Sequence, residues 1–218
     1  MRMQSRQLRW AMASVTVASV LAFTLSPAIG QSVVSRGTRD ARSYRLNPDP
    51  PCFDNANRYV NCGNGTVTDT HTGLIWLQDA GCLGSLDWAA ANQAAAALEN
   101  GQCGLTDGSR PGDWRLPSNA EWTAMVDAAR NHLLLRCTNP ALTDDSGSVC
   151  FGDGSGSSFS NLARVYWSST TDSQSSGLLP DATKAGVVDL SNGLVLTYSD
   201  KSCCPHQAWP ASPLRPPS

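Results

Sequence analysis

The sequence predicts an α+β domain with two helices, short antiparallel strands and long loops tied by disulfide bonds. Two segments carry helical patterns with recognisable ends, and five or six short segments carry strand patterns between turn residues. The 218 residues include 18 Gly and 13 Pro, which indicates a loop-rich fold, and eight Cys. At about 100–200 residues per domain, this length fits one domain with extensions.

The first strands are predicted around a hairpin turn. Asn64 and Gly65 separate two runs of β-forming residues, and Asn-Gly is a strong hairpin signal because both residues tolerate positive φ. After a second turn, the apolar run 74–77 contains Trp76 and is typical of a buried strand.

Two helices are predicted in the middle of the chain. The alanine-rich segment 85–100 has Asp87 near its start and a glycine just beyond its end. The second helix is predicted to begin at Ser118, because Ser118 and Glu121 have the spacing of a capping box. Trp122 then opens an apolar pattern at i, i+3, i+4 and i+7, which indicates one buried helix face.

The other strands flank the second helix. Trp114 and Arg115 belong to a short predicted strand that ends at Pro117. After the helix, two further strands are joined by a Ser-Asn-Gly turn. The strands after the helix are predicted at residues 165–168, 186–190 and 194–198.

The first 30 residues have the organisation of a secretory signal peptide. Three Arg precede the apolar stretch 11–25, and small residues precede a predicted cleavage site before Gln31. Fifteen apolar residues are too few for a favoured membrane span. We therefore expect an exported protein (periplasmic, cell-surface or secreted) with no membrane span after cleavage.

The mature chain is predicted to have three parts. Its lead-in repeats Arg at every third position, a pattern that suits either contact with an anionic polymer or, more simply, a solvated tether. From Lys201 onward the chain is Pro-rich and carries no helix or strand pattern. The parts are a flexible Arg- and Pro-containing lead-in at 31–51, the folded domain at 52–210 and a Pro-rich tail at 211–218.

The charge balance restricts the function classes. Removal of residues 1–30 takes away three of the 16 basic residues and none of the 18 acidic ones, which leaves a formal charge of −5. A generic nucleic-acid-binding protein is usually basic. Because this mature chain is acidic, no nucleic-acid partner is expected.

All eight cysteines lie in the mature part of the chain. An even number in an exported protein predicts disulfide bonds rather than catalytic thiols. Their spacing suggests three bridges that each close a modest loop, and the adjacent Cys203 and Cys204 remain as a pair that the sequence does not assign. The three predicted bridges are Cys52–Cys62, Cys82–Cys103 and Cys137–Cys150.

Catalytic, metal and cofactor signals are weak. Glutamate occurs only at Glu99 and Glu121, and Glu121 already serves the capping box, so no catalytic residue is predicted. No cofactor fingerprint occurs, and no metal site is predicted. Calcium remains an alternative, because Asp144, Asp145 and Asp153 lie in one long loop, although without EF-hand spacing.

Tyr166 and Trp167 are the candidate ligand-binding aromatics. They lie in a predicted strand beside hydroxyl-bearing residues, and such a pair can stack on a sugar ring. Packing in the core is the alternative interpretation. Ser168, Ser169 and Asp172 complete the candidate ligand-binding set.

Three sequence blocks together resemble the Lcl C-terminal domain family. The blocks are Arg58 to Trp76, Cys103 to Pro117 and Tyr166 to Thr170, and the resemblance covers about residues 52–210. It implies an exported bacterial domain with a compact C-type-lectin-like fold. The best-known members are the tips of collagen-like surface adhesins that bind sulfated glycosaminoglycans. This chain has no Gly-x-y repeat, so the resemblance does not imply a collagen stalk.

The segment from Arg115 to Trp122 also resembles formylglycine-generating-enzyme domains, which include oxidases. A later block of that family is absent, and a scaffold role explains the segment: a strand, a proline stop, a capping box and a buried Trp. The residues interpreted as structural motif are Asn64, Gly65, Trp76, Trp114, Arg115, Pro117, Ser118, Glu121 and Trp122.

The function expected from these patterns is that of an exported, non-catalytic, adhesin-like binding module. Its partner would be a glycan or another extracellular or envelope polymer, bound at the irregular loops 131–164 and 172–184. One alternative is a formylglycine-generating-enzyme-like oxidase, which needs a reactive Cys. The other is a structural envelope protein without a small ligand. The oligomeric state is left open.

Overall fold

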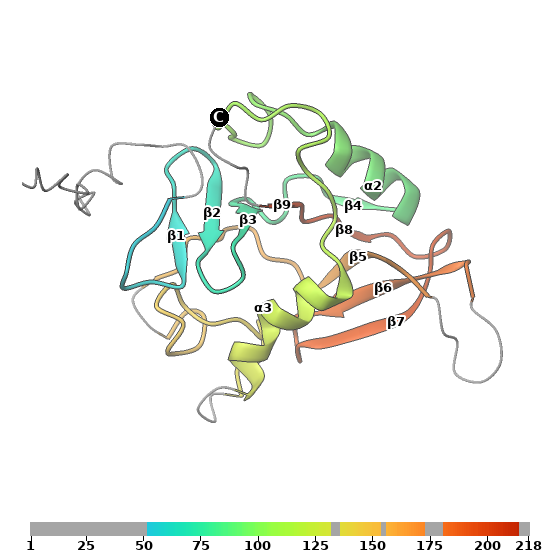
Figure 1. The fold of residues 1–218 in the computed structure, drawn as a ribbon. Helices are drawn as coiled ribbons and strands as arrows, with labels where there is room; N and C mark the ends of the chain where they lie inside the picture. Colours follow the sequence, from blue (N-terminus) through green and yellow to red (C-terminus); the bar gives the residue numbers. More distant parts are fainter. Residues whose placement is uncertain (1–51, 132–135, 154–155, 173–180, 214–218) are drawn as a thin grey trace, which may run out of the picture. The chain divides into compact units, whose positions relative to one another are not determined.

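The computed structural model describes residues 52–131, 136–153, 156–172 and 181–213, which form two sheets and two helices (Figure 1). The chain divides into two units at residue 38, and all described residues belong to the second. The predicted α+β class is confirmed. The expected signal peptide, the lead-in 31–51 and residues 214–218 of the tail lie outside the described residues.

The first sheet has four strands in the order β1-β2-β3-β9, and every pairing is antiparallel. The predicted hairpin and the predicted buried strand are confirmed, since β2 and β3 are buried throughout. The last strand, β9, lies among residues expected to form an unpatterned tail, yet Ala211 pairs with Trp76 of β3. The strands are β1 (Tyr59–Asn61), β2 (Thr66–Asp69), β3 (Leu74–Leu77) and β9 (Ala211–Pro213).

The second sheet has five strands in the order β4-β8-β5-β6-β7. The predicted hairpin around the Ser-Asn-Gly turn is confirmed as β6 and β7. Two strands of two residues each were not predicted, because such short segments carry no measurable alternation. The strands are β4 (Ser85–Leu86), β5 (Val165–Thr171), β6 (Lys184–Asp189), β7 (Leu194–Asp200) and β8 (His206–Gln207).

The two helices are α2 (Trp88–Ala97) and α3 (Asn119–Asn131). Helix α2 begins later than predicted, because residues 85–86 pair with β8 and Asp87 caps the helix by accepting a 2.7 Å hydrogen bond from the Ala90 N–H. Figure 1 shows α3 against β5, β6 and β7, and α2 beside β4 and β5. The predicted strand at 114–116 is reduced to a single bridge between Arg115 and Ala211.

Buried aromatic side chains join the two sheets. Trp76 of β3 lies with its ring centroid 5.1 Å from Trp122 of α3 and 5.2 Å from Trp209, which precedes β9. Tyr166 of β5 stacks on Trp122 with centroids 5.7 Å apart. The buried indole N–H of Trp209 donates to the Leu77 carbonyl at 2.8 Å. One aromatic core therefore holds both sheets against α3.

All three predicted disulfide bonds are confirmed: Cys52–Cys62, Cys82–Cys103 and Cys137–Cys150. The unassigned pair, Cys203 and Cys204, forms a fourth disulfide between adjacent residues. All eight cysteines of the chain lie in the described residues and all are paired.

Candidate functional site

Tyr166 and Trp167 do not form a ligand-binding surface. Both side chains are fully buried. Burial raises the pKa of Tyr166 to about 12, and its hydroxyl accepts the Ala163 N–H. The Trp167 indole donates to the Leu86 carbonyl at 2.8 Å, which ties β5 to β4. The prediction that these rings stack on a sugar is therefore wrong, and the alternative of core packing is confirmed.

The other members of the candidate ligand-binding set have mostly structural surroundings. Ser168 is fully buried and its hydroxyl accepts from the Thr170 N–H at 3.1 Å. Ser169 is half-buried, and its N–H donates to the Pro117 carbonyl. Asp172 is buried, and its N–H donates to the Lys184 carbonyl. Residues 166–168 of β5 are buried in succession, and Asp172 just beyond the strand is buried as well, so these groups present no shared ligand surface.

Trp88 is the aromatic side chain that this region leaves partly exposed. Its indole N–H donates to the Ser168 carbonyl at 2.8 Å, and the ammonium nitrogen of Lys201 lies 4.2 Å from the centroid of its ring. A cation over an indole face is a stabilising arrangement. Lys201 therefore covers one face of this ring.

The predicted capping box at the start of α3 is confirmed, and Arg115 completes it. The Ser118 N–H donates to Glu121 at 2.7 Å, and the Glu121 N–H donates to the Ser118 hydroxyl at 3.3 Å. Arg115 adds two hydrogen bonds to the Glu121 carboxylate, at 2.8 and 2.6 Å. Burial alone would raise the pKa of Glu121, but the hydrogen bonds from Arg115 and Ser118 outweigh it and lower the pKa. This carboxylate has a structural role.

The remaining motif residues also support the scaffold. Asn64 is buried, and its side-chain oxygen accepts from both the N–H and the hydroxyl of Thr66. Gly65 has a φ of +84° and lies against the Gly104 carbonyl. Trp76, Trp114 and Trp122 are buried in the core.

A pocket of about 220 Å³ lies beside the turn that joins β6 to β7. Three chain segments that are distant in sequence form it, and backbone hydrogen bonds connect them: Ala141 to Leu190, and Leu190 to Arg164. The pocket therefore has fixed walls. Its apolar lining comes from Pro140, Leu162, Ala163 and Leu190, and its polar lining comes from Asn139, Arg164 and Ser191.

The rim of this pocket carries an exposed guanidinium group. Arg164 donates two hydrogen bonds to one oxygen of Asp189, at 3.2 and 2.9 Å, and its side chain remains 71% exposed. The interaction with Arg164 is the main cause that lowers the pKa of Asp189. A charge-assisted pair of this kind fixes the direction of the guanidinium group while most of its surface faces solvent.

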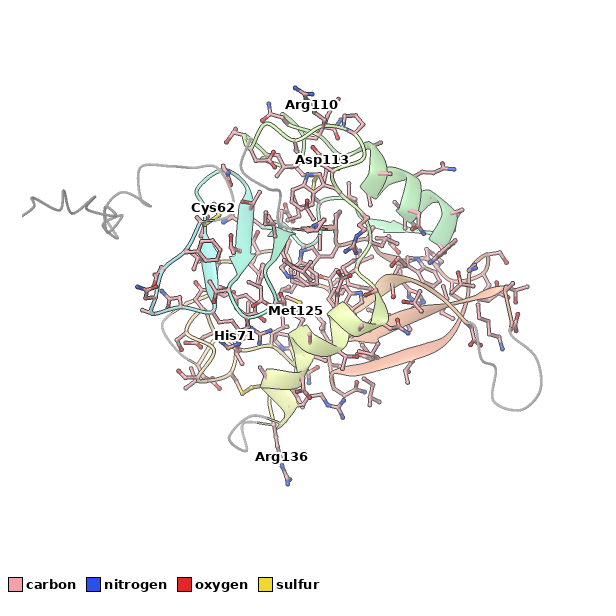
Figure 2. The ribbon with its side chains drawn as sticks, in the orientation of Figure 1. Cys62, His71, Arg110, Asp113, Met125 and Arg136 are labelled. Atoms are coloured by element: carbon pink, nitrogen blue, oxygen red, sulfur yellow. A yellow bond between two sulfur atoms is a disulfide. The ribbon has the colours of Figure 1, made fainter. Side chains whose placement is uncertain are left out.

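Arg130 extends the basic surface on the other side of the same turn. It is exposed and donates to the Gly193 carbonyl at 3.0 Å. Arg164 and Arg130 thus bind the first and last residues of the turn Asp189–Gly193. Figure 2 shows Arg136 projecting below α3, whereas Arg110 projects from the opposite side of the domain.

Comparison with known proteins identifies the family of this chain. The sequence model of the Lcl C-terminal domain matches residues 65–210, about two thirds of the chain. The chain belongs to the Lcl C-terminal domain family. Within this Lcl C-terminal domain lie both helices and the entire pocket. No curated protein and no solved structure matches the chain.

The ligand face was expected at two loops of the Lcl C-terminal domain, and one of them contributes residues to the pocket. The loop 131–164 contributes Asn139, Pro140 and residues 162–164 to the pocket. Most of the loop 172–184 lies outside the described residues. Sequence reasoning missed Leu190 and Ser191, because a hairpin turn shows no sign of which distant loop it packs against.

The carboxylates considered for calcium have hydrogen-bond donors from their own loop. Asp144 accepts from the Ser146 hydroxyl at 2.8 Å and from the Ser148 N–H at 3.3 Å. Asp145 accepts from the N–H and the hydroxyl of Ser158, both at 2.8 Å. In the part of the chain that the structure describes, no three His, Cys, Asp or Glu side chains gather in a metal-binding arrangement.

Among the described residues of the Lcl C-terminal domain, no helix has the length and apolar character to cross a membrane.

His206 is half-buried beside Ser199, with the His206 Nε2 and the Ser199 hydroxyl 2.8 Å apart. Burial lowers the pKa of His206. His206 is thus held by the Ser199 hydroxyl and by the Trp167 ring, whose centroid lies 4.6 Å from that of the imidazole.

Proposed function

We propose that this Lcl C-terminal domain is an exported, non-catalytic binding module that recognises a glycan or another cell-surface polymer, in the manner of an adhesin. The observation that carries the proposal is the fixed pocket beside the β6–β7 turn, with Arg164 on its rim. A rigid scaffold that presents loop-built pockets is a common basis of binding.

The chemistry of the pocket suits one unit of a polymer. At about 220 Å³ it is smaller than the roughly 300–1,000 Å³ typical of sites for drug-sized ligands. Pro140 and Leu162 offer an apolar wall to the C–H face of a sugar ring, and Asn139 and Ser191 offer hydrogen bonds to hydroxyl groups. Arg164 and Arg130 add positive charge for an acidic group elsewhere on the polymer.

Four disulfide bonds support the proposal of export, because such bonds persist in oxidising compartments. The signal-peptide pattern of the first 30 residues supports it independently.

Two observations favour binding over catalysis. The oxidase alternative needs a reactive cysteine, and all eight cysteines are paired. The carboxylate of Glu121, the one glutamate in a family-like motif, is held by Arg115 and Ser118 in the helix cap.

The test is binding of the oxidised mature chain, residues 31–218, to a glycan panel that includes sulfated polymers, at low and at physiological salt. We expect selective binding that persists at physiological salt and weakens by roughly 10- to 150-fold in Arg164→Ala, since a charge-assisted contact is worth roughly 1.5–3 kcal/mol. Arg110→Ala removes another exposed Arg, one that does not line the pocket, and should bind normally.

The other outcomes separate the alternatives. Binding at low salt alone would indicate nonspecific charge attraction, including that of the Arg-containing lead-in. No binding, together with self-association of the chain, would favour the structural envelope protein. Equal loss in both Arg variants would show that the pocket is not the site.

A further inference from the structure

The disulfide between Cys203 and Cys204 differs from the other three in its surroundings. It lies in the loop of residues 201–205 that joins β7 to β8. Both cysteines are exposed. Each of the other three bonds has at least one cysteine that is shielded: Cys52, Cys62 and Cys137 are buried, and Cys103 and Cys150 are half-buried, whereas Cys82 alone among these six is exposed. A thiolate from solution therefore reaches the Cys203–Cys204 bond without any opening of the core.

The connectivity of this bond also makes it the easiest to reduce. The neighbouring peptide unit fixes the Cα atoms of Cys203 and Cys204 3.8 Å apart, below the usual range of about 4.4–6.8 Å for a disulfide. The bond closes no loop of chain, so it gains little from restricting the unfolded state. The Cys82–Cys103 bond spans 21 residues and gains much more from that effect.

We propose that Cys203–Cys204 is a thiol–disulfide exchange site that takes two electrons from a dithiol, while the other three bonds remain structural. The dithiol is either a small molecule or the reduced Cys-x-x-Cys pair of an exported oxidoreductase. This inference is independent of polymer binding at the pocket and stands or falls separately.

The exchange proceeds in two balanced steps. A thiolate of the dithiol attacks one sulfur of the Cys203–Cys204 bond, which forms a mixed disulfide and releases the other cysteine as a thiolate. The second thiol of the reductant, as its thiolate, then attacks its partner sulfur in the mixed disulfide. The reductant leaves as a disulfide, and the two cysteine thiolates take up protons according to their pKa values. Two electrons pass from the dithiol to the protein.

The structure keeps the effect of this reduction local, because the loop is anchored on both sides of the bond. On one side, the Lys201 N–H donates to the Thr183 carbonyl at 2.9 Å, and the Lys201 carbonyl accepts the Trp88 N–H at 3.2 Å. On the other side, His206 contacts Ser199 and pairs with Leu86 of β4. None of these contacts uses a cysteine sulfur, so the reduced domain retains them.

The test is a titration of the folded full chain with dithiothreitol, followed by trapping with iodoacetamide and peptide mapping by mass spectrometry. We expect Cys203 and Cys204 to become alkylated at a dithiol concentration about tenfold or more below that required for the other six cysteines. The circular dichroism spectrum should stay unchanged at that concentration. Simultaneous alkylation of all eight cysteines, or earlier alkylation of Cys82 and Cys103, would overturn the proposal.

A double variant, Cys203→Ser with Cys204→Ser, provides the matched control. It should fold and should show no alkylation at the low dithiol concentrations that open the bond in the unaltered chain. If the variant still consumes dithiol in that range, the exchange site lies elsewhere. A disulfide-linked dimer of the unaltered chain on a non-reducing gel would contradict the pairing within one chain.

Discussion

Arg58 and Asp69 form an ion pair with almost no contact with solvent, between the residue before β1 and the last residue of β2. The Arg58 side chain donates to both carboxylate oxygens, at 3.2 and 3.1 Å, and the two side chains are 1% and 0% exposed. A third hydrogen bond from Arg58 reaches the Ala124 carbonyl of α3 at 3.2 Å. The Arg58–Asp69 pair therefore connects the first sheet to helix α3.

The first prediction concerns this ion pair. Asp69→Asn removes the negative charge and leaves the Arg58 guanidinium buried without compensation. Loss of one partner of a buried pair costs about 3–5 kcal/mol. Chemical denaturation at neutral pH should show a loss of unfolding free energy of that size.

The control removes both charges. Arg58→Met combined with Asp69→Leu should recover a large part of the lost stability, because no isolated charge remains in the core. If the double variant is less stable than Asp69→Asn alone, the pair contributes mainly through hydrogen bonds and packing.

The second prediction concerns the pH dependence of the cap on α3. The folded-state pKa of Glu121 is lowered, so its stabilising contribution is fully present above the unfolded pKa of about 4.3 and is lost as the pH falls through the lower folded value. The difference in unfolding free energy between the unaltered chain and Glu121→Gln should be largest near neutral pH. It should shrink in strongly acid solution, as measured by urea denaturation across the pH range.

A pH-independent difference for Glu121→Gln would mean that the geometry of the cap, rather than its charge, supplies the stability.

The third prediction compares two glycines of the β1–β2 turn. Gly63 has a φ of +75° with nothing near the position of an added Cβ, so Gly63→Ala should cost about 1–2 kcal/mol for the left-handed backbone. At Gly65, with a φ of +84°, an added Cβ would lie 2.5 Å from the Gly104 carbonyl oxygen. Gly65→Ala should therefore cost about 1–3 kcal/mol more, from overpacking. Equal melting temperatures for the two variants would disprove the close approach.

The fourth prediction concerns the Cys82–Cys103 bond. Cys82→Ser should destabilise the domain by about 2–5 kcal/mol, the usual cost of losing a native disulfide. Cys103→Ser should give the same melting curve within error, because both variants remove one bond. An unchanged melting curve would show that the bond contributes nothing to stability.

Local signals allowed much of the fold to be predicted. The start of α3 was predictable because its capping box needs only Ser118 and Glu121, which are three residues apart. Such a local motif can be recognised from the sequence alone. The three spaced disulfides were also predictable, because each closes a short loop.

The candidate site was harder to predict, because its parts meet only through tertiary packing. Tyr166 and Trp167 look the same in sequence whether they face solvent or the core, and both are buried. The residues that line the pocket include Asn139, Leu162 and Leu190. They are far apart in the sequence, and no local pattern indicates that they meet. The strands β8 and β9 contain too few residues for periodicity to identify them.

The position of β9 has a consequence for the order of events during synthesis. Ala211 pairs with Trp76 of β3 and exchanges both backbone hydrogen bonds with Arg115. The first sheet thus acquires its fourth strand only after residues 211–213 have been synthesised. Contacts between such distant residues form slowly, because a long segment must first be brought to closure. Until β9 pairs, the β3 edge of the first sheet stays open, so the closure of this sheet is a late step of folding.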